Sequence, residues 1–341
     1  MFNKNISHNK DSKNPLFHRL INHIKNMSNI TQLCLLLAVT AALAVFFYNV
    51  PETNPVNSSG ASASGIGGGS IVGDCMVGKK ALPIYCVDVE SKNKSAHSNS
   101  ATEQSSATSQ NASESQSTSQ TQSASQNQST SQNQSTSEPK YISLSFDAAW
   151  GADDTIEILD ILDKHNIKVT FFMTGGWVES FPDMVKEIYS RGHDLGNHSQ
   201  NHKHMSKLSV SEQISEIDSV TKSVKELTGY EMFLFRPPYG DYDSTLVKTI
   251  YGCNYYPIQW SVDSLDWKDY GVENIIKTVT KHKALDNGAI ILMHNGAKYT
   301  AKALDETITK LKEQDYTLVP ISELIIKQNF HMDGTGKQIA D

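Results

Sequence analysis

The sequence predicts an α/β domain built on a parallel sheet over residues 139–330. From Tyr141 onward, short runs of β-branched, aromatic and other apolar residues alternate with stretches that have a helical pattern. In one of these stretches the apolar residues recur at steps of three and four, the period of a helix with one buried face. Strands that alternate with helices pair in parallel, so the expected architecture is either a barrel or a doubly wound sheet.

Seven strand-like runs can be placed in chain order along this domain. They are Ile142–Asp147, Lys168–Thr174, Asp194–Asn197, Met232–Arg236, Tyr255–Ser261, Ala289–Met293 and Thr317–Val319. The clearest helix lies between the third and fourth runs, and its apolar positions are Ile214, Ile217, Val220, Val224 and Leu227. Ser209 and Glu212 fit a capping box at its start, in which each side chain bonds the backbone N–H of the other residue.

The first fifty residues predict a cytoplasmic segment followed by a membrane anchor. Residues 1–30 are polar and contain several lysines and an arginine, whereas residues 31–50 contain the apolar run LCLLLAVTAALAVFFYNV. That run approaches the ~20 residues needed to span a bilayer, and the preceding positive charges predict that the rest of the chain is extracellular. A cleaved signal peptide is the alternative. Phe46–Asn49 stand where a small-residue cleavage site is expected, which favours an uncleaved, single-pass anchor.

Two low-complexity segments follow the anchor. Residues 51–80 are rich in Ser, Gly and Asn and predict a flexible tether. Residues 91–138 contain near-repeats such as SQNQSTSQNQSTS and almost no apolar side chains, so they predict a disordered insertion. Between them, residues 81–90 have the pattern of a strand, which we expect to pair with Tyr141–Phe146. Residues 331–341 are expected to form a C-terminal tail.

Composition and cysteine content restrict the possible functions. The net charge is -7 and no strongly basic stretch lies outside the first thirty residues, so the chain lacks the electrostatic pattern of a nucleic-acid binder. No CxxC spacing indicates a structural zinc site. Cys75 and Cys86 lie in one short segment, where a disulfide and two unrelated thiols are both open alternatives.

Polar residues stand at the ends of five of the strand-like runs. Asp147 and Arg236 end the first and fourth runs, and His198, Asp263 and His294 follow the third, fifth and sixth. In parallel α/β architectures the carboxyl ends of the strands gather on one face, where active sites are built. We therefore expect these side chains to lie close together.

Two histidines in this set have the spacing of metal ligands. His198 and His202, in HSQNH, are four residues apart, which on a helical turn places both imidazoles on one face. Solvated or core histidines are the alternative interpretation of such a pair. His193 and His204 lie nearby and fit either polar surface positions or supporting roles around the site.

Five short motifs contain these polar residues. They are SFDAAWG at Ser145–Gly151, HSQNH at His198–His202, RPPYG at Arg236–Gly240, DSLDW at Asp263–Trp267 and LMH at Leu292–His294. In this order they resemble the motifs of the NodB-like polysaccharide deacetylases, also called carbohydrate esterase family four. The resemblance covers about Tyr141 to Leu324 and implies a distorted (β/α)7 barrel with a groove at the strand ends.

The resemblance also implies a role for each matching residue. It implies that Asp147 is the general base, that Arg236 orients it, and that His294 is the general acid, tuned by Asp266. His198 and His202 would hold a divalent metal, zinc or cobalt, and the backbone N–H of Tyr239 would stabilise the oxyanion. Tyr239, Trp267 and Leu292 would contact the substrate, the last two as apolar walls around the acetyl methyl group.

One position departs from the family pattern. The first motif usually has two adjacent aspartates, a base and then a metal ligand, but Asp147 is followed here by Ala148. An alanine cannot bind a metal, so the third ligand would have to be water or another residue that reaches in, such as Asp153 or Asp154. The favoured interpretation of Asp153 and Asp154 is that they stand at the N-terminus of a helix, where acidic residues are favoured by the helix dipole.

The sequence therefore predicts a membrane-anchored N-deacetylase of cell-wall polysaccharide, with peptidoglycan as the expected substrate. Ala148 motivates an alternative from another class, a glycan-binding protein without catalytic activity on the same scaffold. A third hypothesis, an extracellular spacer or adhesion protein, leaves the five motifs unexplained.

Overall fold

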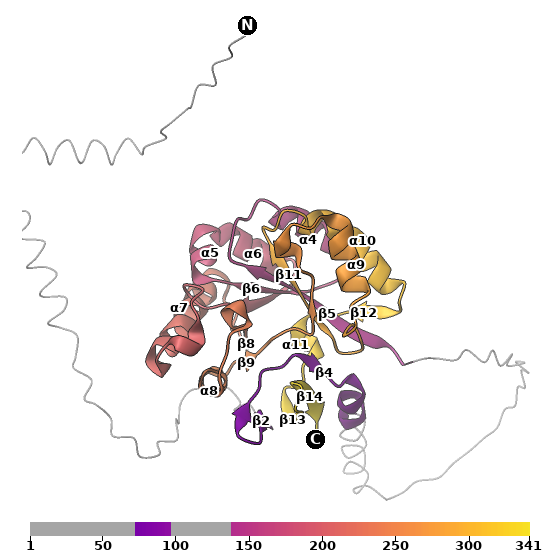
Figure 1. Cartoon of the computed structure of the whole chain (residues 1–341). Helices are drawn as coiled ribbons and strands as arrows, with labels where there is room; N and C mark the ends of the chain where they lie inside the picture. Colours follow the sequence, from indigo (N-terminus) through magenta and orange to yellow (C-terminus); the bar gives the residue numbers. More distant parts are fainter. Residues whose placement is uncertain (1–71, 97–137) are drawn as a thin grey trace, which may run out of the picture. The chain divides into compact units, whose positions relative to one another are not determined.

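The computed structural model describes residues 72–96 and 138–341. An 8-stranded parallel sheet runs through the centre of the domain in the order β10-β11-β5-β6-β7-β8-β9, with β12 beside β5 (Figure 1). The strands are β5 (Lys140–Ala148), β6 (Thr170–Met173), β7 (Asp194–Asn197), β8 (Leu234–Phe235), β9 (Tyr256–Pro257), β10 (Val262–Asp263), β11 (Ile290–Asn295) and β12 (Tyr316–Leu318).

The predicted α/β class with a parallel sheet is confirmed, and each of the seven predicted runs contains a strand. The sheet differs from the predicted seven-stranded barrel in two ways. It has an additional strand, β10, and its two ends, β9 and β10, do not pair with each other, so the curled sheet is a half-barrel. The sequence pattern did not separate β10 because its two residues follow almost directly on the predicted run Tyr255–Ser261.

Most of the helices cover the outer face of the sheet, whereas α11 (Ile321–Leu324) packs on the opposite face (Figure 1). The longest, α7 (Val210–Thr228), is the predicted amphipathic helix, and both halves of the capping box between Ser209 and Glu212 are formed. Gly229 ends it in the left-handed conformation, with φ of 75°. The others are α4 (Thr155–Lys164), α5 (Gly175–Ser180), α6 (Pro182–Ser190), α8 (Ser244–Gly252), α9 (Val272–Thr280), α10 (Thr300–Lys312) and α11 (Ile321–Leu324), with 3₁₀ turns η1 (Met205–Lys207), η2 (Pro238–Gly240) and η3 (Asp266–Lys268).

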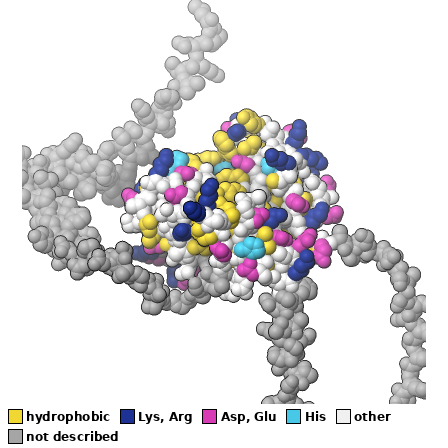
Figure 2. All heavy atoms as spheres, turned by 60° about the horizontal axis from the view of Figure 1, so that its bottom comes forward, with side chains coloured by type: hydrophobic (Ala, Val, Ile, Leu, Met, Phe, Trp, Pro, Cys, Tyr) yellow, Lys and Arg dark blue, Asp and Glu magenta, His cyan; other side chains and the backbone are white. Residues whose placement is uncertain are grey.

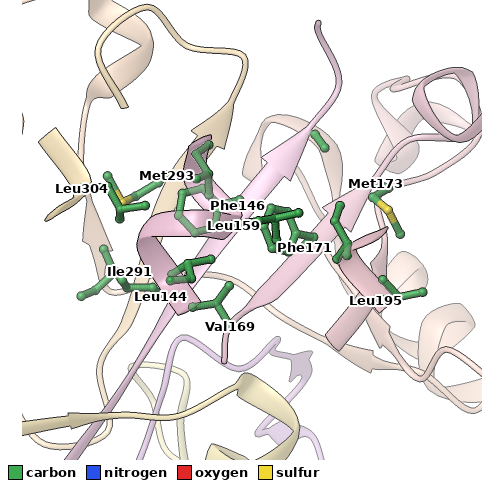
Figure 3. Close-up of a cluster of buried hydrophobic side chains, with 14 of the residues drawn as sticks. Leu144, Phe146, Leu159, Val169, Phe171, Met173, Leu195, Ile291, Met293 and Leu304 are labelled. Carbon is green, nitrogen blue, oxygen red and sulfur yellow. The ribbon is translucent and has the colours of Figure 1, made fainter. Parts of the chain in front are cut away.

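Alternation along the strands divides the apolar side chains between two cores. Leu144 and Phe146 of β5 belong to the larger core, which the outer helices complete (Figure 3). Phe172 of β6 and Ile290 of β11 point the other way, into a second core inside the curve of the sheet. Because successive side chains of a strand face opposite sides, Asp147 lies on the inner face, away from Phe146.

Residues 72–96 are an integral part of the domain. Ile84 forms a bridge with Ile258, just after β9, and Cys86 forms one with Ala289, just before β11. Two backbone hydrogen bonds, Ile84 N–H to the Pro257 carbonyl at 2.8 Å and Val87 N–H to the Gly288 carbonyl at 3.0 Å, hold this segment between the two sides of the sheet. It thus fills the gap that the half-barrel leaves.

A small second sheet joins this segment to the end of the chain (Figure 1). Its strand order is β1-β13-β14-β4. Side chains such as Phe330, which is fully buried, lie on the face of this sheet that packs against the rest of the domain. The strands are β1 (Val72–Asp74), β13 (Gln328–Met332), β14 (Lys337–Ala340) and β4 (Cys86–Val87), and a further pair consists of β2 (Met76–Val77) and β3 (Lys80–Ala81).

Several predictions about chain organisation are corrected by these contacts. The segment 81–90 pairs with β14 and Ile258, not with Tyr141–Phe146. Residues 72–80, predicted as tether, form strands, and residues 91–96, predicted as disordered, are helical. The predicted tail after residue 330 forms a hairpin with β13, because alternate side chains such as Met332 are buried there.

The predicted anchor and most of the two low-complexity segments lie outside the described residues. No helix within 72–96 or 138–341 is long and apolar enough to cross a membrane. Cys75, Cys86 and Cys253 are free, so Cys75 and Cys86 do not form a disulfide. On the face shown in Figure 2, basic side chains are mixed with acidic and hydrophobic ones, and no patch of one charge covers it.

Candidate active site

A cavity of about 510 Å³ collects the residues that the sequence motifs single out. It lies where the strands of the large sheet end, as a parallel α/β architecture predicts. Of the candidate residues, Arg236 and Asp266 lie behind its wall and the others line it. The lining consists of Asp147, Ala149, Trp150, His198, His202, Tyr239, Trp260, Asp263, Trp267, Leu292 and His294.

Asp147 is held by a buried arginine. The Arg236 guanidinium donates from Nη1 to Asp147 Oδ1 at 2.7 Å and from Nη2 to Ser145 Oγ at 2.9 Å, and it is fully buried over the ring of Phe172. Burial alone would raise the pKa of Asp147, but the charges of Arg236, His198 and His294 outweigh it, so the pKa lies below its usual range. Asp147 is therefore an oriented carboxylate that stays ionised.

His198 and His202 come together, but not on a helix. Residues 198–202 form an irregular loop in which Ser199 and His202 have positive φ, of 65° and 51°, so the expected helical turn is wrong. The two rings nevertheless lie 4.9 Å apart between centroids. Glu216 of α7 fixes the loop by accepting from the Asn201 backbone N–H at 2.7 Å and from its side-chain amide at 2.8 Å.

The ring of His198 is oriented so that its Nε2 atom faces the cavity and is free to bind a metal. Its Nδ1–H donates to the backbone carbonyl of Arg236 at 2.7 Å, which leaves Nε2 directed at Asp147, 3.5 Å from Oδ2. Burial lowers the pKa of His198 to about 4, and burial also lowers the pKa of His202. Both imidazoles are thus kept neutral, the form in which histidine binds metals.

These residues fit only part of a metal site. Among the residues that the structure describes, no group of three His, Cys, Asp or Glu side chains is placed to hold a metal ion. Catalytic zinc sites usually have three protein ligands. Ala148, which the motif resemblance aligns with the third ligand, is fully buried and packs into the larger core. The two neutral imidazoles could donate two nitrogen ligands, and a metal bound there would need further ligands from elsewhere.

His294 forms a second pair with a buried carboxylate. Its Nδ1–H donates to Asp266 Oδ1 at 2.7 Å, while its backbone N–H and the Thr300 hydroxyl donate to Oδ2 at 2.8 and 2.6 Å. Burial would lower the pKa of His294, but the hydrogen bond and charge of Asp266 outweigh it and raise the pKa. His294 therefore loses its proton at a higher pH than a free histidine does. None of the five sequence motifs contains Thr300.

Tyr239 occupies a strained position at the rim of the cavity. Its φ of 62° is in the left-handed region, which costs a non-glycine residue about 1–2 kcal/mol. Its ring is packed between His202, at 4.5 Å, and His204, at 4.3 Å and nearly parallel. Backbone strain of this kind concentrates at functional sites. His204 thus supports the site, whereas His193 lies in the core against Phe171.

Of the remaining candidate residues, the apolar ones line the cavity and the two aspartates after the first motif do not. Leu292 and Trp267 line it, as expected, and so do Trp150 and Trp260, which the sequence analysis did not select. Asp153 and Asp154 do not line it. Asp154 precedes α4 and accepts from the Gly296 N–H at 2.9 Å, in agreement with the helix-terminus interpretation.

Comparison with known proteins agrees with this geometry. The sequence profile of the family described as Polysaccharide deacetylase matches residues 134–258. The peptidoglycan-N-acetylmuramic acid deacetylase PdaA of Bacillus subtilis is 33% identical over 201 residues, which are 57% of this chain and 74% of that protein. The peptidoglycan-N-acetylglucosamine deacetylase PgdA of Listeria monocytogenes is 40% identical over 185 residues, 54% of this chain and only 39% of that longer protein.

Solved structures include both an enzyme of this family and a protein described as a pseudoenzyme. The structure of B. subtilis PdaA, described as a family 4 carbohydrate esterase, has a TM-score of 0.52 and 34% identity, and covers 55% of this chain and 80% of its own. BA3943 from Bacillus anthracis, a "CE4 family pseudoenzyme", has a TM-score of 0.53 and 34% identity, and covers 56% and 66%. By the extent of these similarities, the chain belongs to the polysaccharide deacetylase family.

Proposed function

We propose that this protein is an N-deacetylase of cell-wall glycan, with peptidoglycan as its substrate. The observation that carries the proposal is the pairing of two oriented groups across one cavity. Asp147 is a carboxylate bonded to Arg236, with a pKa below its usual range, and His294 is an imidazole whose pKa is raised by Asp266. A matched base and acid of this kind suits the hydrolysis of an amide.

Each of these residues has its own part in the proposed reaction. Asp147 takes a proton from water as the water oxygen bonds to the acetamide carbonyl carbon. His294 then donates the Nε2 proton to the sugar nitrogen as the carbon–nitrogen bond breaks, which leaves acetate and a glycan amine. The backbone N–H of Tyr239 is proposed to stabilise the oxyanion, a contribution of roughly 3–4 kcal/mol in related sites. Leu292 and Trp267 form the apolar walls for the acetyl methyl group.

His198 and His202 are proposed to hold a divalent metal, zinc or cobalt, with two protein ligands. When bound, the metal would supply positive charge that favours ionisation of water and polarises the acetamide carbonyl. Because catalytic sites usually have three protein ligands, the affinity of this pair is expected to be weak.

Acetate release tests the proposed function. The protein, with zinc or cobalt added, is incubated with N-acetylated peptidoglycan and released acetate is measured. Metal-dependent release is the expected result. The absence of release from any acetylated glycan, with binding retained, would instead support the second candidate, a non-catalytic glycan-binding protein. Ala148 and the similarity to a pseudoenzyme favour that candidate.

The cellular location that we propose depends on residues outside those that the structure describes. We propose that residues 31–50 anchor the protein in the membrane with its N-terminus in the cytoplasm and the deacetylase domain at the cell wall. The substrates in the names of PdaA and PgdA are cell-wall polymers, which fits this placement.

Replacing Ala148 with aspartate tests position 148 as the missing ligand. Ala148 is the last residue of β5 and packs into the larger core, so the strand end has to shift for a carboxylate there to reach His198 and His202. Zinc affinity, measured by calorimetry, should rise by about tenfold or more. Without zinc the variant should melt at a lower temperature than the parent, because position 148 is fully buried among apolar side chains and an unpaired carboxylate is costly there. Zinc should reverse that loss. Ala152→Asp, which adds a carboxylate outside the cavity, is the control. Equal zinc affinity in Ala148→Asp and the parent would contradict this assignment.

Replacing Asp266 with asparagine is expected to narrow the pH range of activity. The carboxylate raises the pKa of His294, so its loss lowers that pKa, and the protonated acid disappears at lower pH. The alkaline limb of the pH–rate profile should therefore move to lower pH. Thr300→Val removes a hydrogen bond to Asp266 but keeps the charge, and should leave that limb in place. An alkaline limb that does not move in Asp266→Asn would exclude His294 as the acid.

A further inference from the structure

Trp150 is a large aromatic side chain placed at the mouth of the cavity without a role in the proposed reaction. It lines the cavity and is 50% exposed, whereas Trp177, close by in the chain, is almost completely buried. An exposed indole forfeits the free energy that burial of its apolar surface would give. Because it also lines the cavity, this exposed surface is available to a ligand bound there.

The loop that carries Trp150 is fixed on both sides. The Gly151 carbonyl accepts from Trp177 Nε1 at 3.2 Å and from Asn295 Nδ2 at 3.0 Å. Gly296 packs so closely that a Cβ on it would lie 3.0 Å from the Gly151 oxygen and 3.4 Å from the Trp150 Cβ. An aromatic side chain on an ordered loop loses little conformational entropy when a ligand covers it.

The indole is stacked against His294. The two ring centroids are 5.1 Å apart and the planes are inclined by 22°. Since the His294 side chain is only 16% exposed and Trp150 is half exposed, the indole lies toward the mouth and the imidazole toward the interior. In the proposed reaction the acetamide lies between Asp147 and His294, so the reacting sugar would occupy the interior and leave the indole surface to the next ring of the chain.

We propose that Trp150 forms a subsite for the sugar ring adjoining the one that is deacetylated, on the His294 side of the cavity. The apolar C–H face of a pyranose ring matches the flat indole, and a polymer presents such a ring at a fixed place relative to the reacting one. The proposal rests on the proposed function and deepens it, because it makes the substrate an oligomeric glycan and not a free sugar.

Binding of N-acetylglucosamine oligomers of one to five residues, measured by calorimetry in Trp150→Ala and Trp150→Phe, tests the subsite. Affinity of the parent protein should rise with chain length. Trp150→Ala should bind the longer oligomers about tenfold more weakly, which corresponds to about 1.4 kcal/mol, and should bind the single sugar unchanged. Trp150→Phe, which keeps an aromatic face, should retain most of the affinity. Tyr189→Ala, an exposed aromatic outside the cavity, is the matched control.

The outcomes separate this proposal from the proposed function. Equal affinity of Trp150→Ala and the parent for the oligomers overturns the subsite, and so does an equal loss for the single sugar and the oligomers. A parent protein that binds no oligomer overturns it as well. Acetate release is measured in parallel. Its absence, together with Trp150-dependent binding of oligomers, defeats the proposed function and upholds the subsite.

Discussion

Replacing Asp147 with asparagine is expected to reduce kcat/KM for acetate release by roughly 10²–10⁴-fold, the contribution typical of a general base. Asparagine keeps the shape and can still accept a hydrogen bond from Arg236, but it cannot take a proton from water. The substitution also removes the counter-charge of a guanidinium that is fully buried. Breaking a buried ion pair on one side costs about 3–5 kcal/mol, so the melting temperature should fall as well.

Two control variants separate the catalytic effect from the loss of stability. Ser145→Ala removes another partner of the same guanidinium, bonded at 2.9 Å, while the carboxylate stays in place. It should melt at a lower temperature than the parent and keep acetate release. Asp183→Asn changes the same charge at an exposed position and should alter neither quantity. If Asp147→Asn releases acetate at the parental rate, after correction for the folded fraction, Asp147 is not the base.

A chain that begins at residue 138 is expected not to fold stably, although it contains every motif of the family. It lacks Ile84, Val87 and Val89, which are buried in the second core against Ile258 and Phe330. Full burial of such side chains contributes roughly 1.5–3 kcal/mol each, and together they approach the ~5–15 kcal/mol stability of an ordinary domain. Thermal unfolding of chains that start at residues 67 and 138 measures the difference.

Point variants and a peptide make this test specific. Ile84→Ala should reduce the free energy of unfolding by about 2–5 kcal/mol. Ile156→Ala, the same change at a side chain that is 40% exposed, should alter it by about 0.5 kcal/mol or less. A peptide of residues 72–96 should raise the melting temperature of the shorter chain. Equal stability of the two chain lengths would show that the segment is an appendage, not a part of the domain.

Some residues of the site could be predicted from the sequence and others could not. Asp147, His198 and His294 were expected together because each follows a strand of a parallel sheet, and the cavity brings them together. Thr300 and Trp150 were not expected. Thr300 is the first residue of helix α10, and only the fold brings it to Asp266. Trp150 was inside a recognised motif, and the motif itself did not indicate a stacking partner.

The backbone conformation at the site could not be predicted from the sequence either. Several non-glycine residues with positive φ lie in the motif loops, namely Ser199, His202, Tyr239 and Leu265. Left-handed backbone is uncommon for such residues, so a prediction from local preference assigns them ordinary turns or helices. The helical turn expected for His198 and His202 failed for this reason. The loop is held instead by distant groups, among them Glu216.

The sequence by itself determined the alternation of strands and helices, the capped helix α7 and the set of polar residues at the strand ends. These features are encoded in short windows, because the side-chain period and the capping residues act over a few positions. Only the tertiary structure decided that residues 84–87 close the half-barrel, that the C-terminal hairpin joins them, and that Trp150 stacks on His294. Each of these contacts joins residues more than a hundred positions apart. Which of many apolar or aromatic partners meet is fixed by packing of the whole domain, not by any local pattern.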